Sequence, residues 1–176
     1  MVRSINVGGR NRVSMTDLRS LVGSLGFADV ATYLQSGNVV FTATGSARAA
    51  ARSIEDRLAA DLDLSVPVLV RTGPQLAAVV DSTPYGRFTG DPRTVHVTFL
   101  GDVPDPAGIQ SLHDRDDEFG ADRFEVIGTE VHLYCPTGYG ETKLNNTFLE
   151  RRLGVTATTR NWKTVTALTA LAATKP

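Results

Sequence analysis

The sequence predicts an α+β protein made of two ferredoxin-like (βαββαβ) halves with antiparallel sheets, followed by a C-terminal helix. Three observations support this fold class. The spacing of apolar residues changes repeatedly between the helical period and simple alternation. The resulting order of strands and helices occurs twice, without a repeat of the residues themselves. A connection that contains Gly and Pro separates the two copies, which places the halves at residues 1–72 and 94–176, with a helix and linker over residues 73–93.

The first half has the element order of one ferredoxin-like unit. Ser14 is a suitable N-cap for the first helix, and Gly26 is suited to end it. Ser36 and Gly37 form a short link that fits a hairpin turn. The expected elements are a strand at 1–7, a helix between Ser14 and Gly26, strands at 30–35 and 39–42, a helix at 46–62 and a strand at 66–71.

The second half repeats this order after a short helix at 74–81. Gly128 and Thr129 are expected to turn its hairpin. The expected elements are a strand at 94–100, a helix at 107–115, strands at 124–127 and 130–135, a helix at 143–153, an extended segment at 155–160 and a last helix from about 162 to 173.

Composition excludes several classes of protein. A hydrophobic content of 41% and a charged content of 21% are those of an ordinary globular protein. The formal net charge of -1 gives no general attraction to nucleic acid or to an anionic membrane. Cys135 is the single cysteine, which excludes an intramolecular disulfide, and no apolar run is long enough to span a bilayer. We therefore expect a cytoplasmic protein that makes no use of a membrane.

A basic, glycine-containing loop after the first strand is the leading candidate site. Glycines let the main chain approach a ligand closely, and the start of the following helix carries partial positive charge, so the loop could hold an anion. The topology places the loop at the same sheet edge as the first hairpin turn. The alternative is a plain turn with solvated arginines. The candidate residues are Asn6, Gly8, Gly9, Arg10, Arg12, Gln35 and Asn38.

A second candidate cluster combines aromatic, basic and amide side chains near the end of the chain. Such a mixture could stack on a nucleotide or a single-stranded nucleic acid, or could line an enzyme site between the halves. The structural alternative is that Asn161 caps the last helix while Trp162 packs onto the sheet. The residues of the cluster are Tyr134, Lys143, Asn145, Arg160, Asn161 and Trp162.

Two histidines complete the candidates. The alternation of their strands places His96 and His132 on the same outward face of the second sheet, where they could form a metal site or an acid–base pair. A comparable third ligand is missing, so no metal site and no cofactor are expected. The sequence also contains no recognised catalytic motif, which leaves enzyme activity an open question.

Three separated motifs resemble a known family. They are Ser4–Gly9, Thr32–Phe41 and Thr158–Val165, and in this order they resemble the bacterial domain-of-unknown-function family 1697. The resemblance covers essentially the whole chain and implies a tandem of small α/β units. It transfers no established activity. The family typically has Gly where this sequence has Ser4.

The leading functional hypothesis is a binding module for an anionic ligand, either a nucleotide or a short nucleic acid. One alternative is an enzyme with a site between the halves. Another is an interaction module that dimerises through an exposed sheet edge or face. The expected oligomeric state is a monomer or a weak homodimer.

Overall fold

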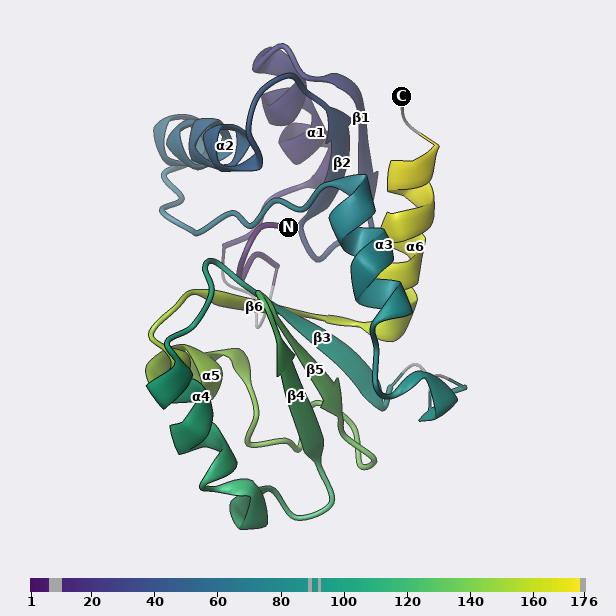
Figure 1. Ribbon diagram of the computed structural model, residues 1–176. Coiled ribbons are helices and arrows are strands. Elements are labelled where there is room, and N and C mark those ends of the chain that lie inside the picture. The colour runs from purple at the N-terminus through teal and green to yellow at the C-terminus, as the bar shows by residue number, and fades with distance from the viewer. Residues whose placement is uncertain (7–10, 89, 92, 175–176) are drawn as a thin grey trace. The chain divides into compact units, whose positions relative to one another are not determined.

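The structure is a computed structural model that describes residues 1–6, 11–88, 90–91 and 93–174. The chain forms two compact units (Figure 1). The first consists of Met1–Ala77 with Ala167–Pro176, and the second is Ala78–Thr166. Two antiparallel sheets and six α-helices occur among the described residues, so the expected α+β class with antiparallel sheets is confirmed. Within the described residues, no helix combines the length and the apolar character that crossing a bilayer requires.

The first unit contains one two-stranded sheet and the helices around it. The Ser14 hydroxyl accepts a hydrogen bond of 3.0 Å from the amide of Asp17, which confirms the expected cap of the first helix. Leu18, Val22 and Leu58 are fully buried and belong to the core of this unit. The elements are α1 Met15–Ser24, β1 Ala28–Tyr33, β2 Asn38–Thr42 and α2 Ala47–Leu62, and two helices shared with the second unit, α3 Gly73–Asp81 and α6 Trp162–Ala173.

The expected strands at 1–7 and 66–71 are wrong for the described residues. Val2 and Val68 form only an isolated antiparallel bridge between these segments. The amide of Val2 also donates a 2.8 Å hydrogen bond to the carbonyl of Gly37, at the start of β2. The first segment is therefore tied to the hairpin by this bond. The two segments are joined to each other only around the bridge, where the amides of Arg3 and Leu69 donate to the carbonyls of Pro67 and Met1, each at 2.9 Å.

Backbone chemistry explains why these ladders stop. Ser4 and Asn6 have φ angles of 54° and 56°, which turn the chain out of the extended conformation. Pro67 has no amide hydrogen to donate to a neighbouring strand. The amide of Val68 donates instead to the carboxylate of Glu55, at 2.7 Å. None of these restrictions is visible in the alternation of apolar residues.

The second unit is built on a four-stranded sheet with the order β4-β5-β3-β6. The central strand β3 is buried along its whole length. Leu112 of α4 and Leu149 of α5 join the core cluster that contains Leu100, Val131 and Leu133 of the sheet, so both helices pack on the same face. The elements are β3 Val95–Leu100, α4 Pro106–His113, β4 Arg123–Ile127, β5 Glu130–Tyr134, α5 Asn146–Leu153 and β6 Ala157–Asn161.

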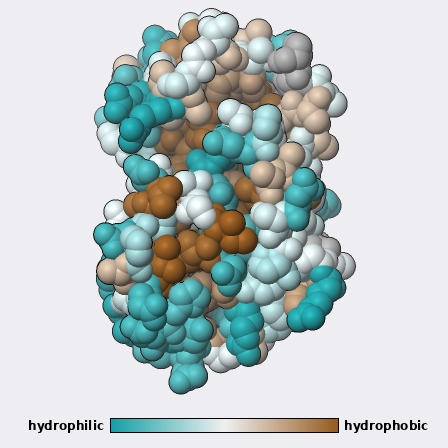
Figure 2. Space-filling view, in the orientation of Figure 1, coloured by the Kyte–Doolittle hydropathy of each residue, from teal (hydrophilic) through white to brown (hydrophobic). Residues whose placement is uncertain are grey.

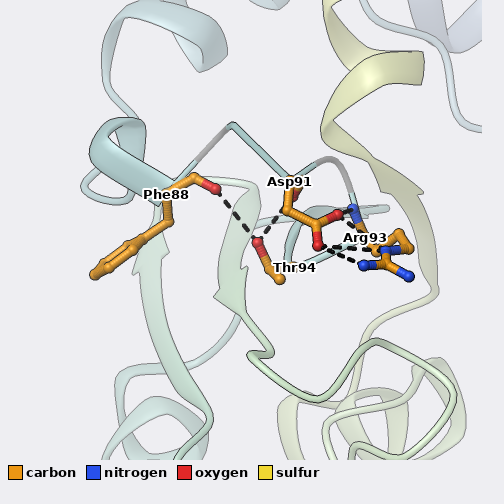
Figure 3. Close-up of polar contacts among 4 residues, drawn as sticks. All are labelled: Phe88, Asp91, Arg93 and Thr94. Carbon is orange, nitrogen blue, oxygen red and sulfur yellow. Dashed lines mark hydrogen bonds and ion pairs between the residues drawn. The ribbon is translucent and has the colours of Figure 1, made fainter.

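Three hydrogen-bonding residues organise the turn that leads into β3 (Figure 3). The Arg93 guanidinium donates to both oxygens of Asp91, with a shortest distance of 2.9 Å. This pairing lowers the pKa of the exposed Asp91 carboxyl to about 2. The Thr94 hydroxyl donates to the carbonyls of Asp91 and Phe88, at 2.8 and 3.3 Å. The turn is therefore fixed immediately before Val95, where the central strand begins.

Candidate functional site

A cavity of about 400 Å³ in the first unit is the candidate binding site. Its wall is formed by β2, the segment that leads into α2, the segment before α3, and the facing sides of α3 and α6. Most of the lining is aliphatic. The lining residues are Met1, Val39–Ala43, Gly45–Ala47, Ala50, Leu69–Pro74, Leu76, Leu168 and Ala172.

Small residues make room for this cavity. A Cβ atom built on Gly73 would lie 3.6 Å from the Cβ of Ala172, so the start of α3 packs directly against α6. Ala47 and Ala50, in the first turns of α2, also line the cavity. Larger side chains at these four positions would occupy space that is now open.

Arg71 and two helix N-termini border one end of the cavity. Arg71 carries the one charged side chain among the described residues that line it. Ser46 caps the N-terminus of α2 by accepting from the amide of Ala49, at 3.1 Å. Thr72 and Gln75 form a reciprocal capping box at α3, with bonds of 2.8 and 3.3 Å. Both helix N-termini thus border the cavity beside Arg71, and each contributes partial positive charge there.

The sequence-predicted basic loop is only partly described. Gly8, Gly9 and Arg10 lie outside the described residues. Arg12 is exposed. The side-chain amide of Asn6 donates to the carbonyl of Gln35 at 2.8 Å, so the loop and the hairpin do meet at this point.

The two asparagines of that prediction are held in internal hydrogen bonds. Asn6 also exchanges two 2.9 Å bonds with the backbone of Val13, one from each side-chain atom. Asn38 is fully buried, and its side-chain nitrogen donates to the carbonyl of Tyr33 and the hydroxyl of Ser36, at 3.2 and 2.9 Å. These amides support the loop and the turn.

In the second predicted cluster, both asparagines act as helix caps. The Asn145 side chain accepts from the amide of Phe148 at 3.0 Å and thereby starts α5, three residues later than expected. The Asn161 side chain accepts from the amide of Thr164 at 2.9 Å, in the first turn of α6. The expected cap at Asn161 is confirmed. Each of these carbonyl oxygens is therefore engaged in holding a helix end.

The other members of the cluster have separate surroundings. Tyr134 stacks on Phe88, with ring centroids 4.0 Å apart. Arg160 donates to the hydroxyl of Thr158 at 3.0 Å, and burial lowers the pKa of its guanidinium to about 10. Lys143 is exposed before α5, while Trp162 is half-buried at the first position of α6.

The prediction that His96 and His132 share a face is wrong. His132 pairs directly with Val97, and His96 pairs with Leu133. Because directly paired residues point to the same side of a sheet and neighbours alternate, the two imidazoles lie on opposite faces. No group of three His, Cys, Asp or Glu residues within the described part of the chain is arranged to hold a metal ion.

Sequence reasoning missed a polar cluster around Thr159. Its hydroxyl accepts from Tyr139 at 2.9 Å and shares a 2.7 Å bond with Thr98. It also donates to the side-chain oxygen of Asn146, at 2.7 Å. The Tyr139 ring stacks on His96, with centroids 4.8 Å apart. The cluster ties the loop after β5 to the sheet. In the sequence, only the positions of His96 and Thr98 indicated it, because residues two apart in a strand lie on the same face of the sheet.

Arg71 and the cavity were also missed. Arg71 follows an apolar segment and precedes Thr72-Gly73-Pro74-Gln75, which has the pattern of a capping box. A basic residue directly before a helix start was therefore a readable signal for this end of the site. The cavity itself had no such signal, because its walls come from segments that are more than one hundred residues apart.

Some large apolar side chains remain exposed. Leu34, Val103 and Ile127 are 57%, 64% and 37% exposed. Val103 precedes α4, and Ile127 ends the edge strand β4, so both belong to the second unit. Figure 2 shows hydrophobic side chains at the surface of this unit.

Comparisons with known proteins identify relatives in sequence and in fold. A family described as a protein of unknown function, DUF1697, matches residues 1–132, which is more than half of the chain. A conserved bacterial protein from Streptococcus pneumoniae has a similar structure, with a TM-score of 0.71 and 21% sequence identity, over 98% of this chain and 96% of that one. At this identity the likeness shows a shared fold. No curated protein matches the sequence.

Proposed function

We propose a function for a chain that belongs to the DUF1697 family of proteins of unknown function: it binds a small molecule in the cavity of its first unit. The cavity is the observation that carries this proposal. Its volume of about 400 Å³ is within the range of small-molecule sites, which are mostly apolar with a few polar groups at defined places. The polar side chains of its described lining are those of Thr42, Ser46, Arg71 and Thr72.

A binding screen with a blocking variant tests the proposal. The probes are neutral and anionic compounds with one aromatic ring, observed by saturation-transfer NMR. Ala172→Leu fills the cavity, whereas Ala170→Leu adds the same volume at an exposed position on α6. We expect at least one probe to bind the wild type and Ala170→Leu alike, and to bind Ala172→Leu at least tenfold more weakly.

Two results would contradict the proposal. One is that no probe binds the wild type, and the other is that Ala172→Leu binds as well as Ala170→Leu. Thermal unfolding of each variant shows whether it is folded. Ala47→Leu fills the cavity from α2 and gives a second blocking variant if Ala172→Leu disturbs the packing on α3.

The basic glycine loop is a second candidate, for an inorganic or phosphorylated anion. The support is the contact between Asn6 and Gln35, which holds both ends of the predicted site together, and the exposure of Arg12. A thermal-shift assay measures how much phosphate stabilises each protein. We expect phosphate to stabilise Arg12→Gln less than the wild type. Arg19→Gln, at an exposed position of α1, is expected to be stabilised as much as the wild type. Equal stabilisation of both variants would exclude Arg12 from such a site.

We also propose that both halves are ferredoxin-like, with limits at residues 1–72 and 94–176 around a helix and linker at 73–93. The order β4-β5-β3-β6 and the element sequence of the second half support this. In the first half, the hydrogen bond from Val2 to Gly37 and the bridge between Val2 and Val68 follow the same order beside the β1-β2 hairpin. The first half would then be a reduced copy in which two of the three ladders of the sheet are shortened to isolated contacts.

A further inference from the structure

We propose that two copies of this chain associate through the open edge of the second sheet, with β4 of one copy antiparallel to β4 of the other. This interface belongs to the second unit and includes no residue that lines the cavity of the first. Three observations support it: the direction of the backbone groups of β4, the regularity of this edge, and the charges on its exposed face.

The backbone of β4 has hydrogen-bonding groups on the side away from β5. The carbonyl of Thr129 and the amide of Cys135 bond with residues at the two ends of β3, so the odd-numbered residues of β5 direct their backbone groups towards β3. The even-numbered residues of β5 therefore bond with their direct partners in β4, which are residues 123, 125 and 127. The backbone groups of Phe124 and Val126 point to the other side, where β4 has no neighbouring strand among the described residues.

This edge is regular. All five residues of β4 pair with β5 in one uninterrupted register. In the first unit, by contrast, the pairing of β1 with β2 is interrupted between Ala28 and Ala31, where Asp29 has a φ angle of 52°. An irregularity of this kind protects an edge strand from pairing with another chain. β4 lacks that protection and ends at Ile127, which is 37% exposed.

One positive and one negative side chain lie on the same exposed face of β4. Arg123 and Glu125 are both exposed and are two residues apart. The guanidinium group of Arg123 donates to the carbonyls of Gly120 and Asp122, both at 2.7 Å and both from one terminal nitrogen, which leaves its other donors for a carboxylate. Glu125 makes no ion pair or side-chain hydrogen bond within the described part of the chain.

These two charges select one register between the copies. When Phe124 lies opposite Phe124 of the partner copy, the outward backbone groups meet, and Arg123 of each copy lies opposite Glu125 of the other. A shift of two residues is the smallest that keeps the backbone groups facing each other. Such a shift places Glu125 opposite Glu125 in one direction and Arg123 opposite Arg123 in the other, and like charges in direct opposition are destabilising. The two-fold axis therefore passes beside Phe124.

Charge reversal at the two positions tests this interface. Sedimentation velocity over a series of concentrations gives the dissociation constant of the dimer. Arg123→Glu and Glu125→Arg each place like charges opposite one another, whereas the variant with both changes restores opposite charges and the net charge of the wild type. Arg151→Glu, at an exposed position of α5, controls for net charge. Val126→Pro removes an outward amide hydrogen and no bond to β5.

We expect the wild type to form a dimer that dissociates on dilution. The dissociation constants of Arg123→Glu, Glu125→Arg and Val126→Pro are expected to be at least tenfold higher, because like charges or a missing donor then lie in the interface. The variant with both reversals and Arg151→Glu are expected to associate as the wild type does. An equal mixture of Arg123→Glu and Glu125→Arg is expected to recover association, because opposite charges then face each other in the mixed dimer.

Three results would overturn the proposal. One is a wild type that stays monomeric at every concentration. Another is a variant with both reversals, or a mixture of the two single ones, that associates as weakly as Arg123→Glu alone. The third is a Val126→Pro variant that dimerises as tightly as the wild type, because the copies would then meet at a different surface. Far-UV circular dichroism shows that each variant is folded, and recovery in the mixture requires that both of its members are.

Discussion

His96 is held as a neutral imidazole inside the second unit. It lies on the central strand β3 with 7% of its surface exposed, and it stacks on Tyr139. Burial lowers the pKa of His96 to about 4. Burial also lowers the pKa of His132, which is fully buried on the other face of the sheet. Both groups therefore resist protonation in the folded state.

This resistance predicts that stability falls in mild acid. The pKa of His96 is lower in the folded protein than in the unfolded chain, so the unfolded chain binds the proton first as the pH drops. The stability present above about pH 6.5 is lost as the pH falls towards 4, by about 3 kcal/mol for a shift of this size. Urea unfolding at pH 7.5, 6 and 5 measures the loss.

His96→Phe keeps an aromatic ring against Tyr139 and removes the titrating group. We expect a shallower dependence of the unfolding free energy on pH in this variant, with the remainder due largely to His132. A pH dependence identical to that of the wild type would show that His96 does not titrate as its burial implies.

At the scale of single residues, the sequence predicted the role of a side chain in its own element better than its neighbours in the folded protein. The capping role of Asn161 was readable, because an asparagine directly before an apolar helix is a common N-cap. The sides of His96 and His132 were not readable, because they depend on which residues of β3 and β5 are paired. A change of one residue in that register reverses the face of every side chain in a strand.

At the scale of elements, α4 and α5 approach each other at a glycine. A Cβ atom on Gly108 of α4 would lie 2.9 Å from the carbonyl oxygen of Arg152 and 3.5 Å from the Cα atom of Leu153, both in α5. Both neighbours are backbone atoms, so an added methyl group forces the two helices apart. This contact explains why a helix interior contains the poor helix former glycine here.

Two glycine substitutions separate packing from helix propensity. Gly108→Ala is expected to lower the free energy of unfolding, because the clash with α5 outweighs the gain in propensity. Gly23→Ala in α1 has no atom within 4 Å of the new Cβ, and is expected to raise it by up to about 1 kcal/mol. Urea unfolding of both variants gives the comparison, and a stabilised Gly108→Ala would contradict the close approach of the helices.

The helices were the more predictable elements. The cap at Ser14 and the helical spacing of apolar residues indicated α1, the same spacing indicated α2, and the bounds of α6 agree with the expectation. Two strands, at 1–7 and 66–71, were expected from the alternation of apolar residues and do not form in the described residues. Continuous pairing is interrupted because Ser4 has a positive φ and Pro67 has no amide hydrogen to donate. These are properties of the backbone, which the apolar pattern does not show.

At the scale of the whole molecule, the duplicated order of elements was visible in the sequence, and the cavity was not. Its wall combines Ala47, Arg71 and Ala172, which only the folded first unit brings together. The basic loop drew attention because its glycines and arginines are adjacent in the chain. A site assembled from distant segments has no such local signature, and its small residues look like ordinary helix formers.

Surface charge and exposed apolar residues together predict self-association. The net charge is -1 and the isoelectric point is near 6.3, so charge repulsion between copies is weak close to that pH. Val103 and Ile127 supply exposed apolar surface in the second unit. We expect the mean mass from light scattering to rise as the pH approaches 6.3, and to rise less for Ile127→Glu.

Leu34→Glu provides the matched control, since it adds the same charge at an exposed apolar residue of the first unit. If both variants reduce association equally, the effect comes from net charge and the apolar surface of the second unit is not its cause.

The cavity as a binding site for a small molecule is tested most directly by mapping where such a molecule binds. Amide chemical shifts of the ¹⁵N-labelled wild-type protein are recorded during a titration with 3-phenylpropionate. We expect saturable changes that are largest at residues 39–47 and 69–73, around the cavity wall. Largest changes within residues 78–166, or no saturable change at all, would contradict it.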